Sequence, residues 1–515
     1  MSEHHDPQSR TGAGDRRAVT IAFGAIVVAM LPAVLDQTIL ATALPTIAAD
    51  LGRLTDVSWV ITAYVVSAAA STPLWGKLGD RHGRGRLLEI ALVWFLAASA
   101  ICGAAQSMTW LIVARAMQGV AAGGLMTLAM AAVGDLVSPR ERGRYQGHIA
   151  ATFAVATVIG PLVGGLLVQH ASWRWVFYVN LPLGAAALVG LRLSLPADVD
   201  ARPGLPLDLG GAVLLTCAAT ALMLACIWGG ARYGWGSATI VTLLAAAVVL
   251  GVAVVARERH APDPIVPLRL LGTRTVWVSS AALFLATAAL FSITVFVPLY
   301  LQTTTGATPT EAGLLLVPMM LGITVSTNLA GRAIARTGRY KRYPLIGLAL
   351  MAVGLGGLAM LAPHPSQAGT ATAIAVFGLG FGMVGQVLIV AVQNSVDRSQ
   401  LGVAMATTSF FRALGGAIGA AVLGAVFAAR VGTSAGAVNL QAVSGLARSD
   451  VIDGVQTVFL AAAPVAAVAL AIAALLKEVP LRGAAPVRPP GRRIPPAGTL
   501  PPGPSPRSSG HRRSH

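Results

Sequence analysis

An aspartate inside an apolar stretch is the residue of this sequence best suited to chemistry. Asp36 stands in "LDQTILATALP", residues 35–45, within a segment that otherwise looks built for hydrocarbon. A charged side chain at that depth costs about 2.5–3.5 kcal/mol on insertion scales, and it marks a functional site by default. Burial disfavours the charged form of a carboxyl group. We therefore expect Asp36 to take up and release protons within the membrane.

The best-placed partner for this carboxylate is Arg115, which lies inside another apolar segment. Asp36 is about ten residues, or ~15 Å at the helical rise, from the outer end of its segment. Arg115 is about six residues, or ~9 Å, from the same face, and an arginine side chain spans the difference. A nearby positive charge favours the ionised carboxylate, so movement of Arg115 relative to Asp36 would switch its proton affinity. The alternative is a static buried ion pair that holds the two helices together.

The sequence contains no pattern that indicates covalent or metal chemistry. The P-loop pattern G-x-x-x-x-G-K-[ST] is absent, and no Cys/His cluster has metal-ligand spacing. Of the twenty Asp and Glu residues, only Asp36 lies well inside an apolar segment. We therefore expect no enzyme, metal or cofactor, and a proton gradient as the source of energy.

The composition places these residues in a membrane protein. The 515 residues are 55% hydrophobic and 11% charged, whereas soluble proteins carry about 25% charged residues. A span needs about 20 mostly apolar residues. The chain has fourteen such segments, which predict an all-α integral membrane protein with fourteen transmembrane helices. They are 18–46, 57–76, 87–106, 109–136, 147–169, 175–197, 209–229, 236–256, 276–301, 311–331, 343–362, 369–394, 403–429 and 455–476.

The positions of Lys and Arg predict the orientation of these helices. With a cytoplasmic N-terminus, 30 of the 37 basic residues fall on the inner side and 5 fall in outer loops. Because cytoplasmic loops carry an excess of Lys and Arg, both termini are predicted to be cytoplasmic. The net charge of +17 then reflects topology and attraction to membrane lipids, and not nucleic-acid binding. We expect a monomer in the cell membrane, with a cytoplasmic tail at 1–17 and a disordered, basic, Pro-rich cytoplasmic tail at 477–515.

A short motif occurs twice along the chain. Residues 76–86 read "GKLGDRHGRGR" and residues 331–342 read "GRAIARTGRYKR". Each copy ends an apolar segment and begins a tight basic turn, where glycine permits backbone angles denied to other residues. A second echo, at the same shift of eight segments, pairs "GPLVGGLL" (160–167) with "GGAIGAAVLG" (415–424). The repeat predicts two six-helix halves, 18–197 and 276–476, with two inserted helices and linkers at 198–275, and parallel repeats are typical of transporters.

Several of these stretches together resemble the major facilitator superfamily, specifically its fourteen-span drug:proton antiporter family. "GKLGDRHGRGR" is similar to the superfamily loop G-x-L-x-D-R-x-G-R-[RK], and "RAMQGVAAGG" (115–124) is similar to the fourth-span motif R-x-x-Q-G-x-G-x-A. "GPLVGG" (160–165) resembles the antiporter motif of the fifth span. "LDQTILATALP" resembles the signature L-D-x-T-I-V-N-V-A-L-P, and "WRWVFYVNLP" (173–182) matches the opening of the sixth span. Ala41 and Ala156 depart from these motifs.

The resemblance implies roles for three groups of residues. The fourth-span arginine, here Arg115, is implicated in proton transfer, which supports its pairing with Asp36. The basic loop implies a charge latch between the halves at a cytoplasmic gate, formed by Asp80 and Arg84 together with Gly76, Arg81 and Gly83. The antiporter motif implies a hinge or a seal against proton leak, through close packing at Gly160, Pro161, Gly164 and Gly165. The alternatives are topogenic charge in the loop and ordinary tight packing of the glycines.

Four polar residues are further candidates to line a substrate cavity: Thr38, Gln118, Gln386 and Arg412. Thr38 extends the polar side of the Asp36 helix. For the glutamines, hydrogen bonding between helices is the alternative use. Arg412 is a second arginine deep in an apolar segment, without an acid at its depth. It either binds backbone carbonyls between the halves or attracts an anionic group on a substrate.

The sequence as a whole predicts a secondary transporter that exports a lipophilic, cationic or neutral drug or antibiotic in exchange for a proton, by alternating access. Its expected partners are this small molecule, protons and membrane lipids. Three alternatives stand beside this prediction: an exporter dedicated to one endogenous metabolite, a lipid exporter, and a non-transporting receptor or scaffold. Asp36 argues against the last, because a receptor needs no proton-binding group deep in the membrane.

Overall fold

The computed structural model describes the chain from residue 13 to residue 479, except residues 52–56, 138–140, 195–207, 231, 262–263, 266–267, 306–315, 365 and 432–447. Within this part of the chain the regular secondary structure is helical, and no β-strand occurs. Of the predicted tail at 477–515, residues 480–515 lie outside the described part of the chain. The helices are α1 (Ala13–Leu51), α2 (Val57–His82), α3 (Arg84–Gly103), α4 (Met108–Leu136), α5 (Arg142–His170), α6 (Trp175–Tyr178), α7 (Asn180–Ser194), α8 (Leu209–Trp228), α9 (Ala238–His260), α10 (Leu268–Leu271), α11 (Arg274–Thr305), α13 (Val317–Thr337), α14 (Arg342–Leu361), α15 (Gln367–Ser395), η2 (Arg398–Gln400), α16 (Leu401–Val431) and α18 (Arg448–Ala474).

Several helices begin at a polar side chain that caps the first turn. Ser107, Asp208 and Ser366 accept hydrogen bonds from the backbone N–H groups three residues on, at the starts of α4, α8 and α15. Such caps satisfy N–H groups that have no partner within the helix. These residues therefore fix where long apolar segments turn back into the bundle.

Twelve helical segments among the described residues are long and apolar enough to cross a membrane, with α6 and α7 together forming one of them. The chain is therefore a multi-pass helical membrane protein. Two further helices, α2 and α13, lie at predicted span positions without reaching the same hydropathy. Both carry small polar side chains that bond to neighbouring helices: Ser71 donates to Val120 O and Thr327 donates to Gly382 O. Polar groups satisfied in this way lower the hydropathy of a helix while it remains buried.

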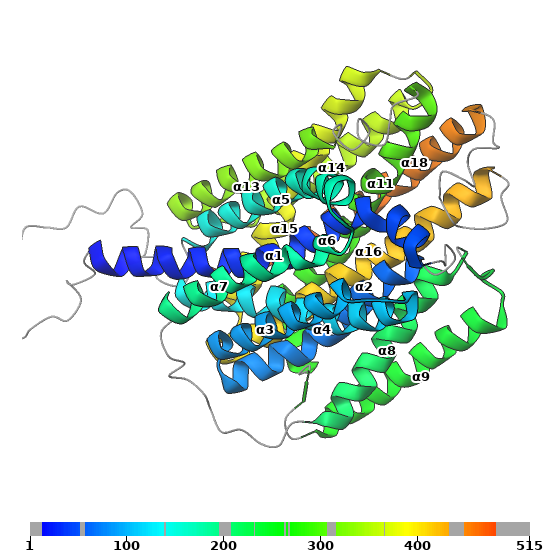
Figure 1. Cartoon of the computed structure of the whole chain (residues 1–515). Helices are drawn as coiled ribbons and strands as arrows, with labels where there is room; N and C mark the ends of the chain where they lie inside the picture. The colour runs from blue at the N-terminus through cyan, green and yellow to red at the C-terminus, as the bar shows by residue number, and fades with distance from the viewer. Residues whose placement is uncertain are drawn as a thin grey trace, which may run out of the picture. The chain divides into compact units, whose positions relative to one another are not determined.

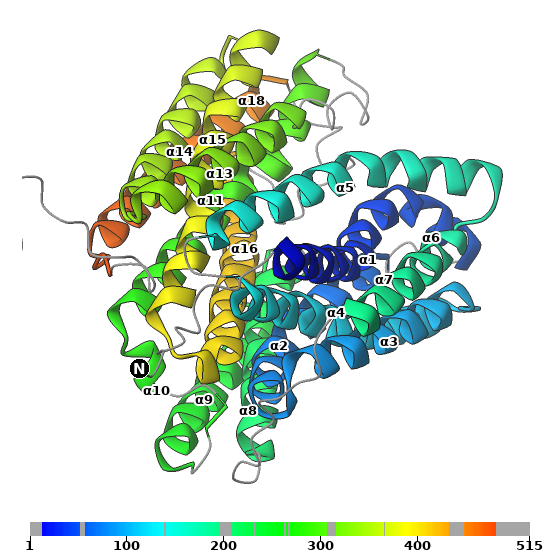
Figure 2. The ribbon, with the colours of Figure 1, turned by 90° about the vertical axis from the view of Figure 1, so that its left-hand side faces the viewer.

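The helices form two sets with the same pattern of packing. In the first set, α4 packs against α2, α3 and α1, and α1 also packs against α5 and α7. In the second set, α15 packs in the same way against α13, α14 and α11, and α11 packs against α16 and α18. Figure 2 shows α13, α14, α15 and α18 gathered on one side, and α1, α3, α4, α6 and α7 on the other. Helices eight predicted spans apart thus occupy equivalent places.

The two sets meet along two seams. The pair α2 and α16 forms one seam, and the pair α5 and α13 forms the other. The helices between the sets, α8 and α9, pack against each other, and α8 also packs against α2 and α16 (Figure 1). The inserted helix α8 therefore borders the first seam.

The two copies of the basic turn share a backbone conformation. Gly83, between α2 and α3, has a φ of 92°, and Gly338, which ends α13, has a φ of 69°. Residues with a side chain rarely adopt such angles. The glycines at the same place in both copies of the motif therefore do what the repeat predicts, namely turn the chain sharply between two helices.

Candidate functional site

Asp36 and Arg115 form an ion pair sealed inside the first set of helices. The Nη1 group of Arg115, on α4, donates to Oδ2 of Asp36, on α1. The Arg115 Nε group also donates to the backbone oxygen of Val60, on α2, at 3.1 Å. Asp36 is 0% exposed and Arg115 is 1% exposed. The two side chains that were matched by depth are thus in contact, and their bonds join three helices.

Three buried polar side chains complete this cluster. Gln118 Nε2 donates to Asp36 Oδ1 at 2.9 Å, and Gln118 Oε1 accepts from Arg115 at 2.7 Å. Asn180, the first residue of α7, donates from Nδ2 to the same Asp36 oxygen at 3.2 Å. Ser99 Oγ accepts from both amides. Both carboxylate oxygens therefore accept hydrogen bonds, which is the arrangement of an ionised carboxyl group.

Sequence reasoning did not select Ser99 or Asn180. Asn180 lies in the quoted motif "WRWVFYVNLP", and this motif was the signal that could have identified it. Ser99 is one small polar residue in an apolar segment, a type that commonly bonds to its own helix. For the other member of the cluster, Gln118, the sequence offers a cavity or hydrogen bonding between helices, and the structure has the second: Gln118 is fully buried and bonds to Asp36.

Tyr64 separates the ion pair from a cavity. Its ring lies 4.2 Å from the Arg115 guanidinium carbon, within the range of a cation–π contact. Its hydroxyl donates to the backbone oxygen of Ala33 at 3.2 Å. Tyr64 also lines a cavity of about 180 Å³, together with Gln37, Thr72, Thr127, Ser409 and Arg412. The wall of this cavity is therefore in direct contact with the partner of Asp36.

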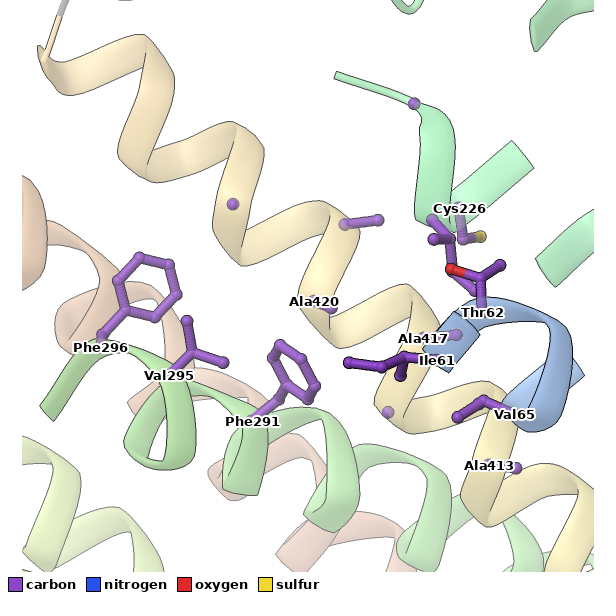
Figure 3. Close-up of a pocket in the computed structure, with 15 residues that line it drawn as sticks. Ile61, Thr62, Val65, Cys226, Phe291, Val295, Phe296, Ala413, Ala417 and Ala420 are labelled. Carbon is purple, nitrogen blue, oxygen red and sulfur yellow. The ribbon is translucent and has the colours of Figure 1, made fainter. Parts of the chain in front are cut away.

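A second, larger cavity of about 490 Å³ adjoins the first, with which it shares Val65 and Ala413. Its lining is apolar and comes from α2, α8, α11 and α16. Figure 3 shows Phe291, Val295 and Phe296 of α11 on one side and Ile61, Thr62 and Val65 of α2 on the other, with α16 between them. Its volume lies within the usual range of about 300–1,000 Å³ for small-molecule sites.

The four expected cavity residues have separate surroundings. Arg412 lines the smaller cavity. Thr38 faces α5, where its hydroxyl lies against the position of Gly160. Gln386 lies between α5, α13 and α15, away from both cavities. In this structure Arg412 thus lines a cavity, Thr38 packs against α5, Gln118 makes hydrogen bonds between helices, and Gln386 borders a closed gap between the sets.

Asp80 joins the two sets of helices through backbone groups. Its carboxylate accepts from the N–H groups of Gly402 at 2.8 Å and Val403 at 2.9 Å, in the first turn of α16. Arg84 donates to Asp80 and to Asp135, all within the first set. The charge latch was expected to be formed by Asp80 and Arg84. Instead, the bonds that cross the seam are donated by backbone N–H groups at the N-terminus of α16 to the Asp80 carboxylate, and negative charge is favoured at such a terminus. Burial raises the pKa of Asp80, against the opposing effect of Arg84.

Glycines make this approach possible. A Cβ atom on Gly76 would lie 2.5 Å from Gly402 O and 2.6 Å from the Ala406 side chain. A Cβ atom on Gly402 would lie 2.4 Å from Gly76 O and 2.5 Å from Oδ1 of Asp80. Arg81 lies in the last turn of α2, beside this contact in the chain. Gly76 is thus required for the packing itself, and Gly83 for the turn that follows.

Arg142 is a second contact between the sets that sequence reasoning missed. It begins α5, is 4% exposed, and donates to the backbone oxygens of Gly134, in the last turn of α4, and Val137, just after α4. Its Nη1 group also donates to Gln393 O on α15 at 3.0 Å. Gln393 in turn donates to Met130 O on α4 at 3.0 Å. We call the end of the bundle that holds Asp80 and Arg142 the gate end, and hydrogen bonds of both residues join the two sets there.

The antiporter motif packs against the Asp36 helix, with one exception. Cβ atoms on Gly160 and Gly164 would collide with Thr38 and Thr42 of α1, and Gly164 also lies close to Ile39 O, at 2.7 Å from such an atom. Pro161 lies between them within α5. A Cβ atom on Gly165 would meet nothing within 4 Å, so the expected close contact at Gly165 is wrong. The motif glycines on one face of the helix pack tightly, and Gly165 lies off that face.

Comparison with known proteins assigns the chain to a protein family. The model of the Major Facilitator Superfamily matches residues 26–420. The chain belongs to the Major Facilitator Superfamily. An uncharacterised transporter of the superfamily from Mycobacterium tuberculosis (strain ATCC 25618 / H37Rv) is 39% identical over 482 residues, which cover 90% of this chain and 70% of that protein. The multidrug transporter protein MdtP of Bacillus subtilis (strain 168) is 35% identical, over 82% of this chain and 78% of that protein.

A solved structure supports the same fold. The human organic anion transporter MFSD10 superposes with a TM-score of 0.63 at 17% sequence identity, over 90% of this chain and 100% of that chain. The superfamily consists of transporters, so the chain is a transport protein and not an enzyme. In the part of the chain described here, no group of three or more His, Cys, Asp or Glu residues could hold a metal ion.

Proposed function

We propose that this chain is a proton-coupled exporter of lipophilic compounds in the plasma membrane, with fourteen spans and both termini in the cytoplasm. Within that class the sequence predicts cationic or neutral drugs as substrates. The observation that carries the proposal is the Asp36 carboxylate, which is fully buried and bonded to Arg115. The relationship to a protein named as a multidrug transporter supports a lipophilic substrate.

Protonation of Asp36 would change the bonding of the whole cluster. A neutral carboxyl group no longer attracts the Arg115 guanidinium and needs an acceptor for its own proton. Asn180 Oδ1 is buried and has no hydrogen-bond partner among the described residues. Rotation of the Asn180 amide would offer this oxygen to the protonated Asp36. Asn180 is thus suited to bond with both protonation states of the carboxyl group.

Tyr64 connects this change to the substrate. A compound in the smaller cavity would touch the ring that stacks on Arg115. Coupling requires that proton and substrate each bind two conformations with different affinity, and the effect is then reciprocal. One proton that moves through ~100 mV supplies ~2.3 kcal/mol, which supports roughly a forty-fold gradient of a neutral substrate.

The gate end is proposed to be cytoplasmic, with Asp80 and Arg84 as parts of the latch. On α16, Gly402 lies at the gate end and Arg412 lies ten residues, or ~15 Å, further along the helix. An exported substrate would leave the cavities through the other end while this gate is closed. Close packing of Gly160 and Gly164 on α1 would keep the proton site sealed from the lipid side.

The test is transport into inverted membrane vesicles under an imposed pH gradient, with fluorescent lipophilic dyes of different charge. Wild-type protein should take up at least one dye, and an uncoupler should abolish the uptake. Asp36→Asn should lose the response to the pH gradient while it still exchanges dye down a dye gradient. If the pH gradient drives uptake equally in both proteins, Asp36 is not the coupling group.

A further inference from the structure

Arg412 faces the smaller cavity and has no bonding partner among the residues that the structure describes. It comes from α16, and the same cavity is lined by Tyr64 and Ser409. Across the described residues Arg412 makes no hydrogen bond or ion pair, in contrast to Arg115, the other deep arginine, which bonds to Asp36, Gln118 and Val60. Arg412 therefore does not bind backbone carbonyls between the sets, which was the structural alternative for this residue.

A guanidinium group held in this way is costly unless something binds it. An unpaired charge in the membrane interior is unfavourable, and because Arg412 is half-buried beside the cavity, acceptors for its five N–H donors must come from the cavity. Thr127 Oγ1, on the wall of the same cavity, is buried and also lacks a hydrogen-bond partner within the described part of the chain. Two neighbouring polar groups without protein partners therefore border one small cavity, which indicates a ligand that accepts hydrogen bonds.

The chemistry of arginine narrows the kind of ligand. Its planar fork of donors matches the two oxygens of a carboxylate, and such charge-assisted pairs are stronger than neutral ones. Among the described residues that line the two cavities, Arg412 is the charged one. A permanent cation in this space would meet a positive charge and no carboxylate, because Asp36 lies behind Tyr64.

The adjoining cavity supplies the complementary half of the site. It is larger, at about 490 Å³, and its wall consists of aromatic, aliphatic and small residues, among them Phe291, Val295 and Ala417. Burial of an apolar body there would favour binding, because apolar surface is removed from water. Because the two cavities share Val65 and Ala413, one elongated molecule can occupy both.

We propose that the substrate is an amphiphile whose carboxylate binds Arg412 while its apolar body fills the larger cavity. This inference rests on the proposed export function and deepens it, because it replaces lipophilic cations with lipophilic acids as the preferred class. Arg412 then acts as the residue that selects the head group, and Asp36 remains the residue that carries the proton.

The test compares three head groups on one apolar body. The probes are 11-(dansylamino)undecanoate, its methyl ester, and the analogue in which trimethylammonium replaces the carboxylate. Binding to the purified full-length protein in lipid nanodiscs is followed by dansyl fluorescence. The carboxylate should bind at least about tenfold more tightly than the ester, as expected for a charge-assisted hydrogen bond, and the trimethylammonium analogue should bind most weakly.

Variants assign this preference to Arg412. Arg412→Gln should bind the carboxylate and the ester with equal affinity, with the ester affinity unchanged from wild type. Arg412→Lys should keep part of the preference, because the charge remains and the fork is lost. Arg430→Gln is the matched control: Arg430 is also on α16, is exposed, and pairs with Asp453 at 3.4 Å. It should bind all three probes like wild type.

Three results would overturn the inference: wild-type protein that binds the ester or the cation as tightly as the carboxylate, a folded Arg412→Gln protein that keeps the full preference, or Arg430→Gln losing it equally. If Arg412→Gln does not fold, Arg412→Lys and the comparison of head groups in wild type decide the question. Asp36→Asn separates this inference from the proposed function. It should lose proton-driven transport and retain the preference for the carboxylate.

Discussion

The bonds between Asp80 and the start of α16 lead to a prediction whose size follows from the structure. Asp80→Ala removes the acceptor of two N–H groups, those of Gly402 and Val403, at 2.8 and 2.9 Å. Hydrogen bonds to charged groups contribute about 1.5–3 kcal/mol each. Part of this loss is offset, because no carboxylate then has to be desolvated when the gate closes. A net loss of about 2 kcal/mol would raise the ratio of open to closed gates roughly 30-fold.

Distances between spin labels across the seam measure this ratio. His82, at the end of α2, and Gln400, just before α16, are both exposed and suit labelling as cysteines once Cys102, Cys217 and Cys226 are replaced. Double electron–electron resonance should show a larger fraction of molecules with a long distance between the two labels in Asp80→Ala than in the otherwise wild-type protein. The matched control is Asp135→Asn, since Asp135 shares the bond to Arg84 but makes no hydrogen bond to α16 among those described. An unchanged distance distribution in Asp80→Ala, or an equal change in Asp135→Asn, would refute the latch.

Three further predictions concern the gate, the buried ion pair and the contact between α5 and α1. Burial raises the pKa of Asp80 above its ordinary 3.8, so the closed gate holds this proton more tightly than water-exposed carboxyl groups do. Acid should therefore favour the closed gate. This stabilisation is complete below pH 3.8 and is lost as the pH rises through the raised pKa of Asp80, and the distances between the same two labels measure it. Arg115→Gln should destabilise the protein by about 3–5 kcal/mol by leaving Asp36 unpaired, and adding Asp36→Asn should recover part of the loss in thermal unfolding; strictly additive losses would contradict the pair. Gly164→Ala should cost about 1–3 kcal/mol through collision with α1, whereas Gly165→Ala, which faces open space, should stay within about 0.5 kcal/mol in the same measurement.

The contact between Asp36 and Arg115 was predictable because the regular rise of a helix converts sequence position into depth. The sequence does not fix the rotation of each helix about its own axis. It therefore does not decide whether Gln118 and Thr38 face a cavity or a neighbouring helix, and the structure has them against Asp36 and Gly160. For the same reason Ser99 could not be distinguished from polar residues that bond to their own helix.

The repeat shows a second kind of limit. Gly83 and Gly338 were predictable from their place in two copies of one motif, because a sharp turn demands glycine. Gly165 belongs to a motif as well, but the packing of a glycine depends on which face of α5 contacts α1. Gly165 lies on a face that does not contact α1. The partner of Asp80 was missed because a backbone N–H group is present at every position except proline, so the sequence carries no sign of it.

The bonding of Asp80 to backbone amides has a consequence for how this gate can evolve. A carboxylate that pairs with an arginine can be rescued by exchanging both charges, and such exchanges leave correlated substitutions among relatives. No side chain at position 402 or 403 takes part in the bonds made by Asp80, so no second substitution there can restore them. Correlated-substitution methods should therefore be blind to this contact, because burial restricts Val403 and size restricts Gly402, and neither restriction depends on the charge at position 80.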